Sequence, residues 1–174
     1  WAFATIGVME AMYNVENNLY STELSRLLSR RSTEVFRKDT GYQSASGEMR
    51  IKELSYPDFS EQFLISCSPA GDCDGGYEDE AWRYLNQEGV VPEACFPYAA
   101  KNTACSPCGD WQIQLTRIKN WGYVTQSGVR MSAIKSALMD GPLVLYMEVY
   151  SDFYNYKSGI YKPVSSASFE GGHA

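Results

Sequence analysis

The first half of the chain alternates between helical apolar patterns and turn-forming segments. Apolar residues recur at helical spacing over residues 2–19, and they widen into a nearly all-round stripe that predicts a buried helix. A second helix is predicted to start at Ser60, whose hydroxyl can cap it. A third is predicted over residues 78–87, because acidic residues fill its first turn and Gly89 follows its last.

The second half of the chain is richer in β-branched and aromatic residues. We predict strands over residues 121–125 and 143–149, at residues 160 and 161, and around residue 173. A helix over residues 129–139 separates the first two strands and stops at Gly141-Pro142. Helices first and strands later predict an α+β fold, with a helical lobe over residues 1–109 and a partial antiparallel β lobe over residues 110–174.

Composition and charge narrow the class of protein. The 174 residues are 44% apolar and 21% charged, as in ordinary globular domains, and the net charge of −6 argues against nucleic-acid binding. The basic residues between Arg26 and Lys38 alternate with acidic ones, which is typical of a solvated helix face. No window of about eighteen apolar residues occurs, so we expect no membrane span. A signal peptide is also absent, but the chain opens on Trp1 without a methionine, so this absence carries little weight.

Five cysteines are more than a cytosolic enzyme of this size usually carries: Cys67, Cys73, Cys95, Cys105 and Cys108. The last two could form half a zinc site or a redox motif. A zinc site needs two more ligands and the sole histidine is distant, while Pro107 and Gly109 mark a loop rather than the helix start of a redox motif. Disulfides in an oxidising compartment are the better interpretation, and the odd count leaves one thiol without a partner in this chain.

Four short motifs occur in a fixed order. They are Trp-Ala-Phe-Ala at residues 1–4, Ser-Glu-Gln-Phe-Leu-Ile-Ser-Cys at 60–67, Cys-Asp-Gly-Gly-Tyr at 73–77 and Gly-Gly-His-Ala at 171–174. In this order and spacing the chain resembles the papain family of cysteine peptidases from end to end, and residues 150–174 resemble its cathepsin B branch. Asp74 stands where the family usually has asparagine. The resemblance implies a two-lobed papain-like fold.

The resemblance also implies a thiol nucleophile and a histidine partner. The family's nucleophile would immediately precede Trp1, at the start of the first helix, where the helix dipole and a neighbouring imidazolium favour the thiolate. His173 would be the catalytic histidine, which holds the thiolate and then protonates the leaving amine. Taken alone, a single histidine is more often structural, and its setting in Gly-Gly-His-Ala is what points to catalysis. No metal or organic cofactor is implied.

The substrate-binding residues are carried over in the same way. Gly75 and Gly76 would let an extended substrate backbone come within hydrogen-bonding distance, although a Gly-Gly pair also serves an ordinary tight turn. The positions that match the lining of the family's main specificity pocket are Tyr77, Tyr146, Gly172 and Ala174. Because residues 172 and 174 are small, we expect this pocket to accept a bulky apolar or aromatic side chain.

The family pattern also assigns the cysteines. In the family, the cysteine of the Cys-Gly-Gly turn bonds a cysteine that lies upstream of the nucleophile, so Cys73 would be the unpaired thiol. The other four allow three pairings. The resemblance implies the pairs Cys67–Cys105 and Cys95–Cys108, each stabilising the fold by roughly 2–4 kcal/mol.

Three family residues do not occur in the chain: the nucleophile, the upstream glutamine of the oxyanion hole and the asparagine that orients the histidine. The polypeptide as given is therefore expected to be an inactive fragment that also lacks strands of the second lobe. The alternative is a catalytically dead homologue that acts as a peptide-binding or structural module.

Two further departures bear on activity and partners. Residues 21–55 exceed the family's usual connection, and a tolerated surface insertion is a better interpretation than a partner-binding one. The paired histidines of the cathepsin B occluding loop are absent between Cys95 and Cys108, which favours endopeptidase action over removal of C-terminal dipeptides. The expected partners are polypeptide substrates, a propeptide and protein inhibitors, in a secreted or lysosome-like compartment.

Overall fold

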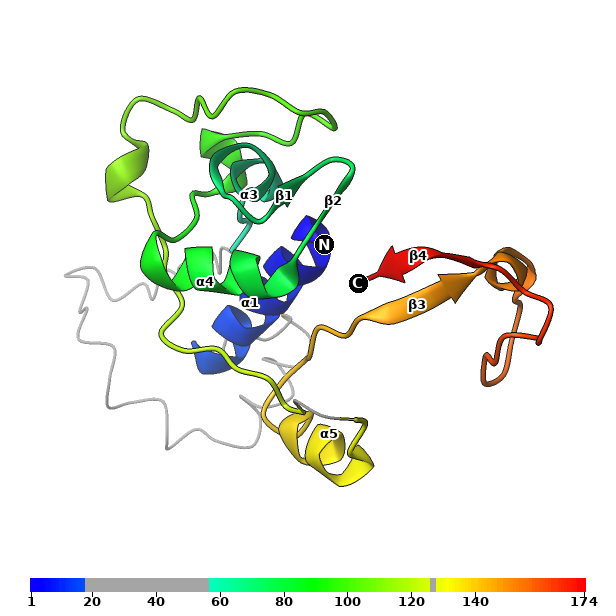
Figure 1. The fold of residues 1–174 in the computed structure, drawn as a ribbon. Coiled ribbons are helices and arrows are strands. Elements are labelled where there is room, and N and C mark those ends of the chain that lie inside the picture. The colour runs from blue at the N-terminus through cyan, green and yellow to red at the C-terminus, as the bar shows by residue number, and fades with distance from the viewer. Residues whose placement is uncertain (18–56, 126–127) are drawn as a thin grey trace, which may run out of the picture.

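The computed structural model describes residues 1–17, 57–125 and 128–174 (Figure 1). Its elements, in chain order, are α1 (Ala2–Glu16), α3 (Glu61–Cys67), β1 (Gly71–Asp72), β2 (Gly75–Gly76), α4 (Glu78–Gln87), α5 (Met131–Ala137), β3 (Met147–Tyr150) and β4 (Phe169–His173). Short 3-10 turns lie at Glu93–Cys95, Trp111–Ile113 and Ser151–Asn155. The predicted insertion over residues 21–55 lies outside the described residues.

The hydrophobic core belongs to the helical lobe, where α1 packs against both α3 and α4 (Figure 1). Ile6, Leu64 and Leu85 have no exposed surface, and every buried apolar side chain of the described residues lies between residues 2 and 95. Residues 111–118 continue this lobe, because three of their apolar side chains pack against the core and Thr116 bridges to Val90. The boundary near residue 109 stays a prediction.

The start of α3 follows the capping rule that its sequence predicts. Ser60 is fully buried, and its Oγ accepts a hydrogen bond from the backbone N–H of Phe63 at 2.9 Å. The same hydroxyl donates to the carbonyl of Phe96 at 2.5 Å. Ser60 therefore satisfies one of the free amides at the helix start and ties that start to a distant loop.

The predicted burial of the first helix on nearly all sides is wrong. Only Ala2, Thr5, Ile6 and Met9 are buried, whereas Phe3 is 54% exposed. Among the described residues only α3 and α4 pack closely on α1, so the opposite face of the helix meets solvent. The ring of Phe3 does pack edge-on against Tyr98, at 4.9 Å between centroids.

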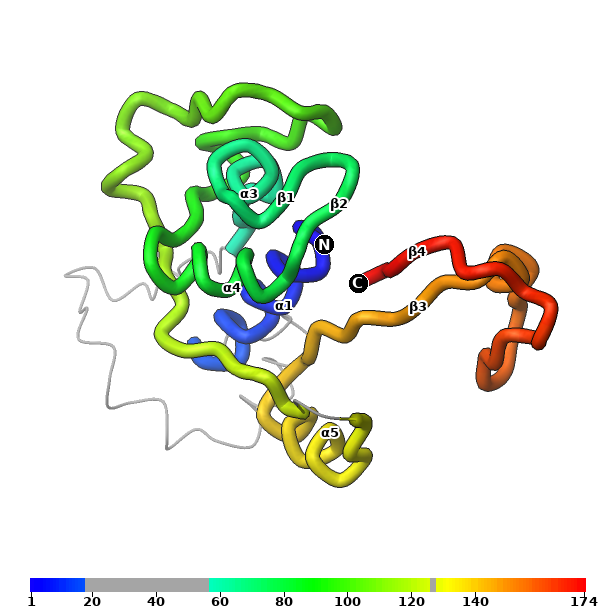
Figure 2. The backbone as a smooth tube through the Cα atoms, viewed as in Figure 1, coloured from blue at the N-terminus to red at the C-terminus, as the bar shows by residue number. Residues whose placement is uncertain are grey.

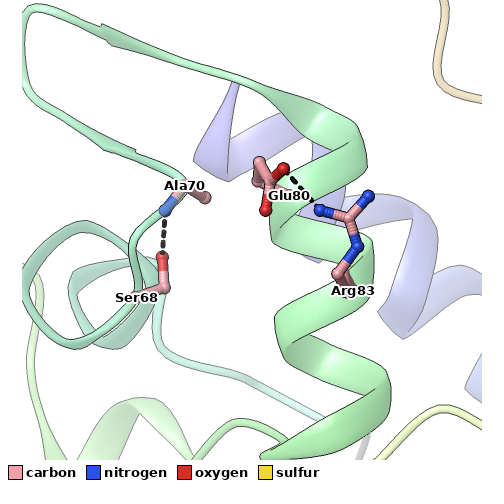
Figure 3. Close-up of polar contacts among 4 residues, drawn as sticks. All are labelled: Ser68, Ala70, Glu80 and Arg83. Atoms are coloured by element: carbon pink, nitrogen blue, oxygen red, sulfur yellow. Dashed lines mark hydrogen bonds and ion pairs between the residues drawn. The ribbon is translucent and has the colours of Figure 1, made fainter.

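A tight hairpin joins α3 to α4. β1 and β2 pair antiparallel, with Gly71 opposite Gly76. Ser68 precedes the hairpin, and its hydroxyl accepts from the N–H of Ala70 at 3.2 Å (Figure 3). After the hairpin, Glu80 and Arg83 form an exposed ion pair one turn apart on α4, which adds little stability because water screens it (Figure 3). α4 covers residues 78–87, as predicted.

The second half of the chain contains one antiparallel strand pair. β3 lies beside β4, with Met147 opposite His173 and a bulge after Val149 (Figure 1). Helix α5 is shorter than the predicted 129–139, and Gly141 after it approaches the sulfur of Met12 on α1. The α+β class is confirmed.

Three strand predictions in this half are wrong. Residues 121–125 and 160–161 form no strand, and residues 143–146 do not extend β3. A strand exists only where a neighbour completes its ladder of backbone hydrogen bonds, and no described segment pairs with these residues. Ile160 shows the consequence, because its side chain is fully exposed at 100%. Within the described ranges, no helix is long and apolar enough to cross a bilayer.

Candidate functional site

The first group of predicted site residues surrounds the start of α1. The indole Nε1 of Trp1 donates to the carbonyl oxygen of Asp72 in β1 at 2.9 Å. The ring also lies flat against Gly76, since a Cβ built there would sit 2.4 Å from ring atom Cε2. Trp1 therefore fixes the first turn of α1 beside the glycine pair, and only a glycine fits at residue 76 without moving the ring.

The tip of the hairpin has its own supports. The N–H of Cys73 donates to Oδ1 of Asn102 at 2.8 Å, and the N–H of Asp74 donates to Oδ1 of Asp72 at 2.8 Å. Gly75 has φ +154°, in the region that favours glycine. Asn102 is a positioning residue that the sequence did not reveal, because no local pattern marks an asparagine in a loop as the partner of a turn 29 residues away.

The outward side of this hairpin is open. Gly75 is exposed, and a Cβ built on it would meet no atom within 4 Å. Tyr77, at the start of α4, is 72% exposed. The hairpin thus offers free backbone and one aromatic ring to a ligand.

The second group of predicted site residues lies on the strand pair. Tyr146 packs its ring against Gly172, where a Cβ would sit 2.2 Å from the ring atom Cε2 and 2.4 Å from the hydroxyl oxygen. His173 follows in β4 opposite Met147, with its side chain exposed, and Ala174 is half-buried. The ring of Tyr146 is itself 62% exposed, so it remains accessible to a ligand.

A pocket of about 420 Å³ opens beside His173. Its lining consists of Val149, Phe153, Tyr154, Glu170 and the Gly171-Gly172-His173 backbone run. The wall is aromatic and firm, because Phe153 stacks on Tyr156 with centroids 5.9 Å apart and meets Tyr161 edge-on at 4.9 Å.

An acid and a phenol brace the loop behind that pocket. Asp152 accepts from the hydroxyl of Tyr161 at 2.6 Å and from the N–H of Val164 at 2.9 Å. These hydrogen bonds lower the pKa of Asp152, and desolvation together with the bond to Asp152 raises the pKa of Tyr161 to about 12. Near neutral pH the carboxylate is therefore ionised and the phenol is protonated.

The two groups of site residues come from different halves of the chain. Figure 2 shows β4 running toward the helical lobe, with the C-terminus directed at the start of α1. Among the described residues, no hydrogen bond or ion pair joins the hairpin group to the strand group. Gly75, Gly76 and Tyr77 thus lie on one lobe, and Tyr146, Gly172, His173 and Ala174 lie on the other.

The cysteines hold the loop that supports the hairpin. The structure joins Cys67 to Cys105, with Cα atoms 4.9 Å apart, and Cys95 to Cys108, with Cα atoms 5.0 Å apart. These are the pairs that the family resemblance implies. Cys73 is a free, exposed thiol at the hairpin tip.

Comparison with known proteins identifies relatives across most of the chain. Residues 40–174 match the family described as papain family cysteine protease. A cathepsin B-like protein of Giardia intestinalis is 36% identical over 124 residues, which cover 67% of this chain and 40% of that protein. The tubulointerstitial nephritis antigen of Bos taurus is 31% identical over 135 residues, covering 63% of this chain and 28% of the antigen.

A solved structure shares the fold. The procathepsin B of Trypanosoma congolense matches with a TM-score of 0.51 and 30% identity, over 66% of this chain and 42% of that one. The chain spans 40% or less of the length of the two sequence relatives named above. The matched family region begins after the first motif, so Trp1 and the start of α1 rest on the structure and on the motif itself.

Proposed function

Because this chain belongs to the papain family of cysteine proteases, we propose that the whole protein is a cysteine-type endopeptidase. The chain by itself contains none of the family's nucleophile, oxyanion-hole glutamine or histidine-orienting asparagine, so it is inactive as given. One observation carries the proposal: Trp1 packs on Gly76, which places the start of α1 beside the backbone that would bind substrate.

The proposed chemistry uses a thiolate and an imidazolium. The residue before Trp1 would supply the thiolate, stabilised by the partial positive charge at the start of α1. The thiolate attacks the carbonyl carbon of the substrate, and His173 transfers its proton to the leaving amine as the C–N bond breaks. Water then releases the acyl group. The exposed position of His173 at the end of β4 supports this role, since the ring must reach a substrate.

Substrate would bind between the two groups of site residues. Gly75 and Gly76 would accept an extended backbone, which their open outer side permits. The main specificity pocket would lie among Tyr77, Tyr146, Gly172 and Ala174, and would favour a bulky apolar or aromatic side chain. The close packing of Tyr146 on Gly172 supports this assignment, because any larger residue at 172 would displace the ring.

The remaining assignments follow from the family and the disulfides. The proposed partners are polypeptide substrates, a propeptide and protein inhibitors, and no metal or organic cofactor takes part. The proform among the similar structures supports the propeptide. Two disulfides support an oxidising compartment, either outside the cell or lysosome-like.

The experiment compares the full-length protein with its His173→Ala variant. We expect kcat/KM for a quenched-fluorescence peptide to fall by roughly a thousandfold or more, because the thiolate loses its partner and the amine loses its acid. Asp140→Asn, an exposed change after α5, serves as the control and should leave activity unchanged. Full activity in His173→Ala would refute the proposed role.

A second candidate is a catalytically dead homologue that binds peptides or serves as a structural module. The similarity to the tubulointerstitial nephritis antigen favours it, because that relative's name states no enzyme activity. The residue encoded just before Trp1 separates the two, since cysteine supports the peptidase. Labelling of the full-length protein by an epoxide that inactivates thiol peptidases gives a second answer, and no labelling would favour the dead homologue.

A further inference from the structure

The pocket beside His173 carries a charge that the proposed chemistry does not use. Glu170 lies in its lining, with an exposed side chain, next to the Gly-Gly-His run. We propose that Glu170 makes this pocket select a lysine or arginine side chain at the residue directly after the cleaved bond. This inference rests on the proposed peptidase function and adds the substrate class.

The location follows from the reaction. His173 gives its proton to the amine of the residue after the bond, so the Cα of that residue must lie close to the imidazole. The pocket includes His173 itself, and therefore lies within reach of that residue's side chain.

The strand register separates this pocket from the main specificity pocket. His173 stands opposite Met147, so its side chain lies on the same face as Met147 and Val149. Tyr146 packs on Gly172, one residue along in both strands, and so belongs to the other face. A substrate crossing His173 would place the side chain before the bond toward Tyr146 and the one after it toward Val149.

The chemistry of the lining fits a cation on an aliphatic stem. One carboxylate oxygen of Glu170 accepts from the hydroxyl of Ser168 at 2.7 Å, which fixes the group, and the described residues supply no hydrogen bond to the other oxygen. Within residues 57–125 and 128–174, no lysine or arginine forms an ion pair with Glu170. The carboxylate is thus available to a charged ligand.

Aromatic rings complete the fit. Tyr154 is 74% exposed and can offer its ring face to an ammonium or guanidinium group, while Val149 and Phe153 can pack against the methylene stem. The other carboxylate of this loop, Asp152, is already engaged by Tyr161 and Val164. Glu170 is therefore the group that would decide the charge preference.

The test measures kcat/KM of the full-length protein on quenched-fluorescence peptides that differ only at the residue after the cleaved bond. We expect arginine and lysine to exceed glutamine by roughly tenfold, as one charge-assisted contact would give. Glu170→Gln should remove the preference and Glu170→Lys should favour glutamate instead. Glu88→Gln, an exposed change after α4, should leave the preference intact. The preference should also weaken as salt rises.

The outcomes separate this inference from the proposed function. Cleavage without a basic preference, or a preference that survives in Glu170→Gln, overturns the role of Glu170 and leaves the peptidase standing. If no peptide is cleaved, the peptidase proposal fails, and anisotropy of a fluorescein-labelled arginine peptide decides the rest. Weaker binding to Glu170→Gln than to Glu88→Gln would then support the pocket, and equal binding would overturn it.

Discussion

Replacing Gly76 with alanine probes the contact that ties α1 to the hairpin. The new Cβ would lie 2.4, 2.5 and 2.7 Å from ring atoms Cε2, Cδ2 and Nε1 of Trp1. Carbon atoms pack at about 3.5–4.0 Å, so the ring would have to move by roughly 1 Å. Its Nε1 now donates to Asp72 at 2.9 Å, and this shift would stretch the bond beyond normal hydrogen-bonding distance.

The expected loss of stability combines these two effects. Forcing a methyl group against a packed ring costs about 1–3 kcal/mol. Loss of the hydrogen bond between Trp1 and Asp72 adds about 1 kcal/mol. We therefore expect Gly76→Ala to lower the free energy of unfolding by about 2–4 kcal/mol.

A double-mutant cycle with Trp1→Ala tests the cause. Urea denaturation of the full-length protein gives the free energy of unfolding of the wild type, both single variants and the double variant. Without the indole, Gly76→Ala should cost less than about 1 kcal/mol. Gly75→Ala is the matched control, because its Cβ meets no atom and its cost comes from φ +154°, which Trp1→Ala cannot relieve. Equal costs of Gly76→Ala in both backgrounds would refute the reasoning.

Two further predictions concern the helical lobe. Ser60→Ala should lower the unfolding free energy by about 2–3 kcal/mol in urea denaturation, because it removes the cap of α3 and the bond to Phe96; the exposed change Ser106→Ala should have no effect, and equal losses would contradict the capping role. Burial raises the pKa of Glu10 above its usual 4.5, so the folded state binds its proton more tightly and stability falls as pH rises from 4.5 through the raised pKa. Glu10→Gln should therefore gain stability over the wild type as pH rises, as denaturation between pH 4 and 7 would detect; a constant difference would contradict this assignment.

The helices were predictable from the sequence because their signals are local. The cap at Ser60 and the acidic first turn of α4 act within one helical turn, and both helices occur where these signals lie. The burial of α1 was not predictable in the same way, since an apolar stripe does not state which neighbours will cover it. The exposed ring of Phe3 shows the difference.

The strands failed for a related reason. Residues 121–125 have strand composition, yet a strand forms only with a partner, and its position is a property of distant segments. The candidate site divides along the same line. Motifs marked Gly76 and His173, but the sequence alone gave no sign of the ring contact from Trp1 or of the pocket that includes Glu170.

The uneven distribution of buried side chains has a consequence for cooperativity. All fully buried apolar groups of the described residues belong to the lobe built on α1, α3 and α4, and none belongs to β3 or β4. Local opening is resisted mainly by apolar contacts, so the amides of the helical lobe should exchange with solvent deuterium far more slowly than those of the strand pair. The histidine would then stand on the part of the molecule that opens first, while the glycine pair stands beside the part that opens last.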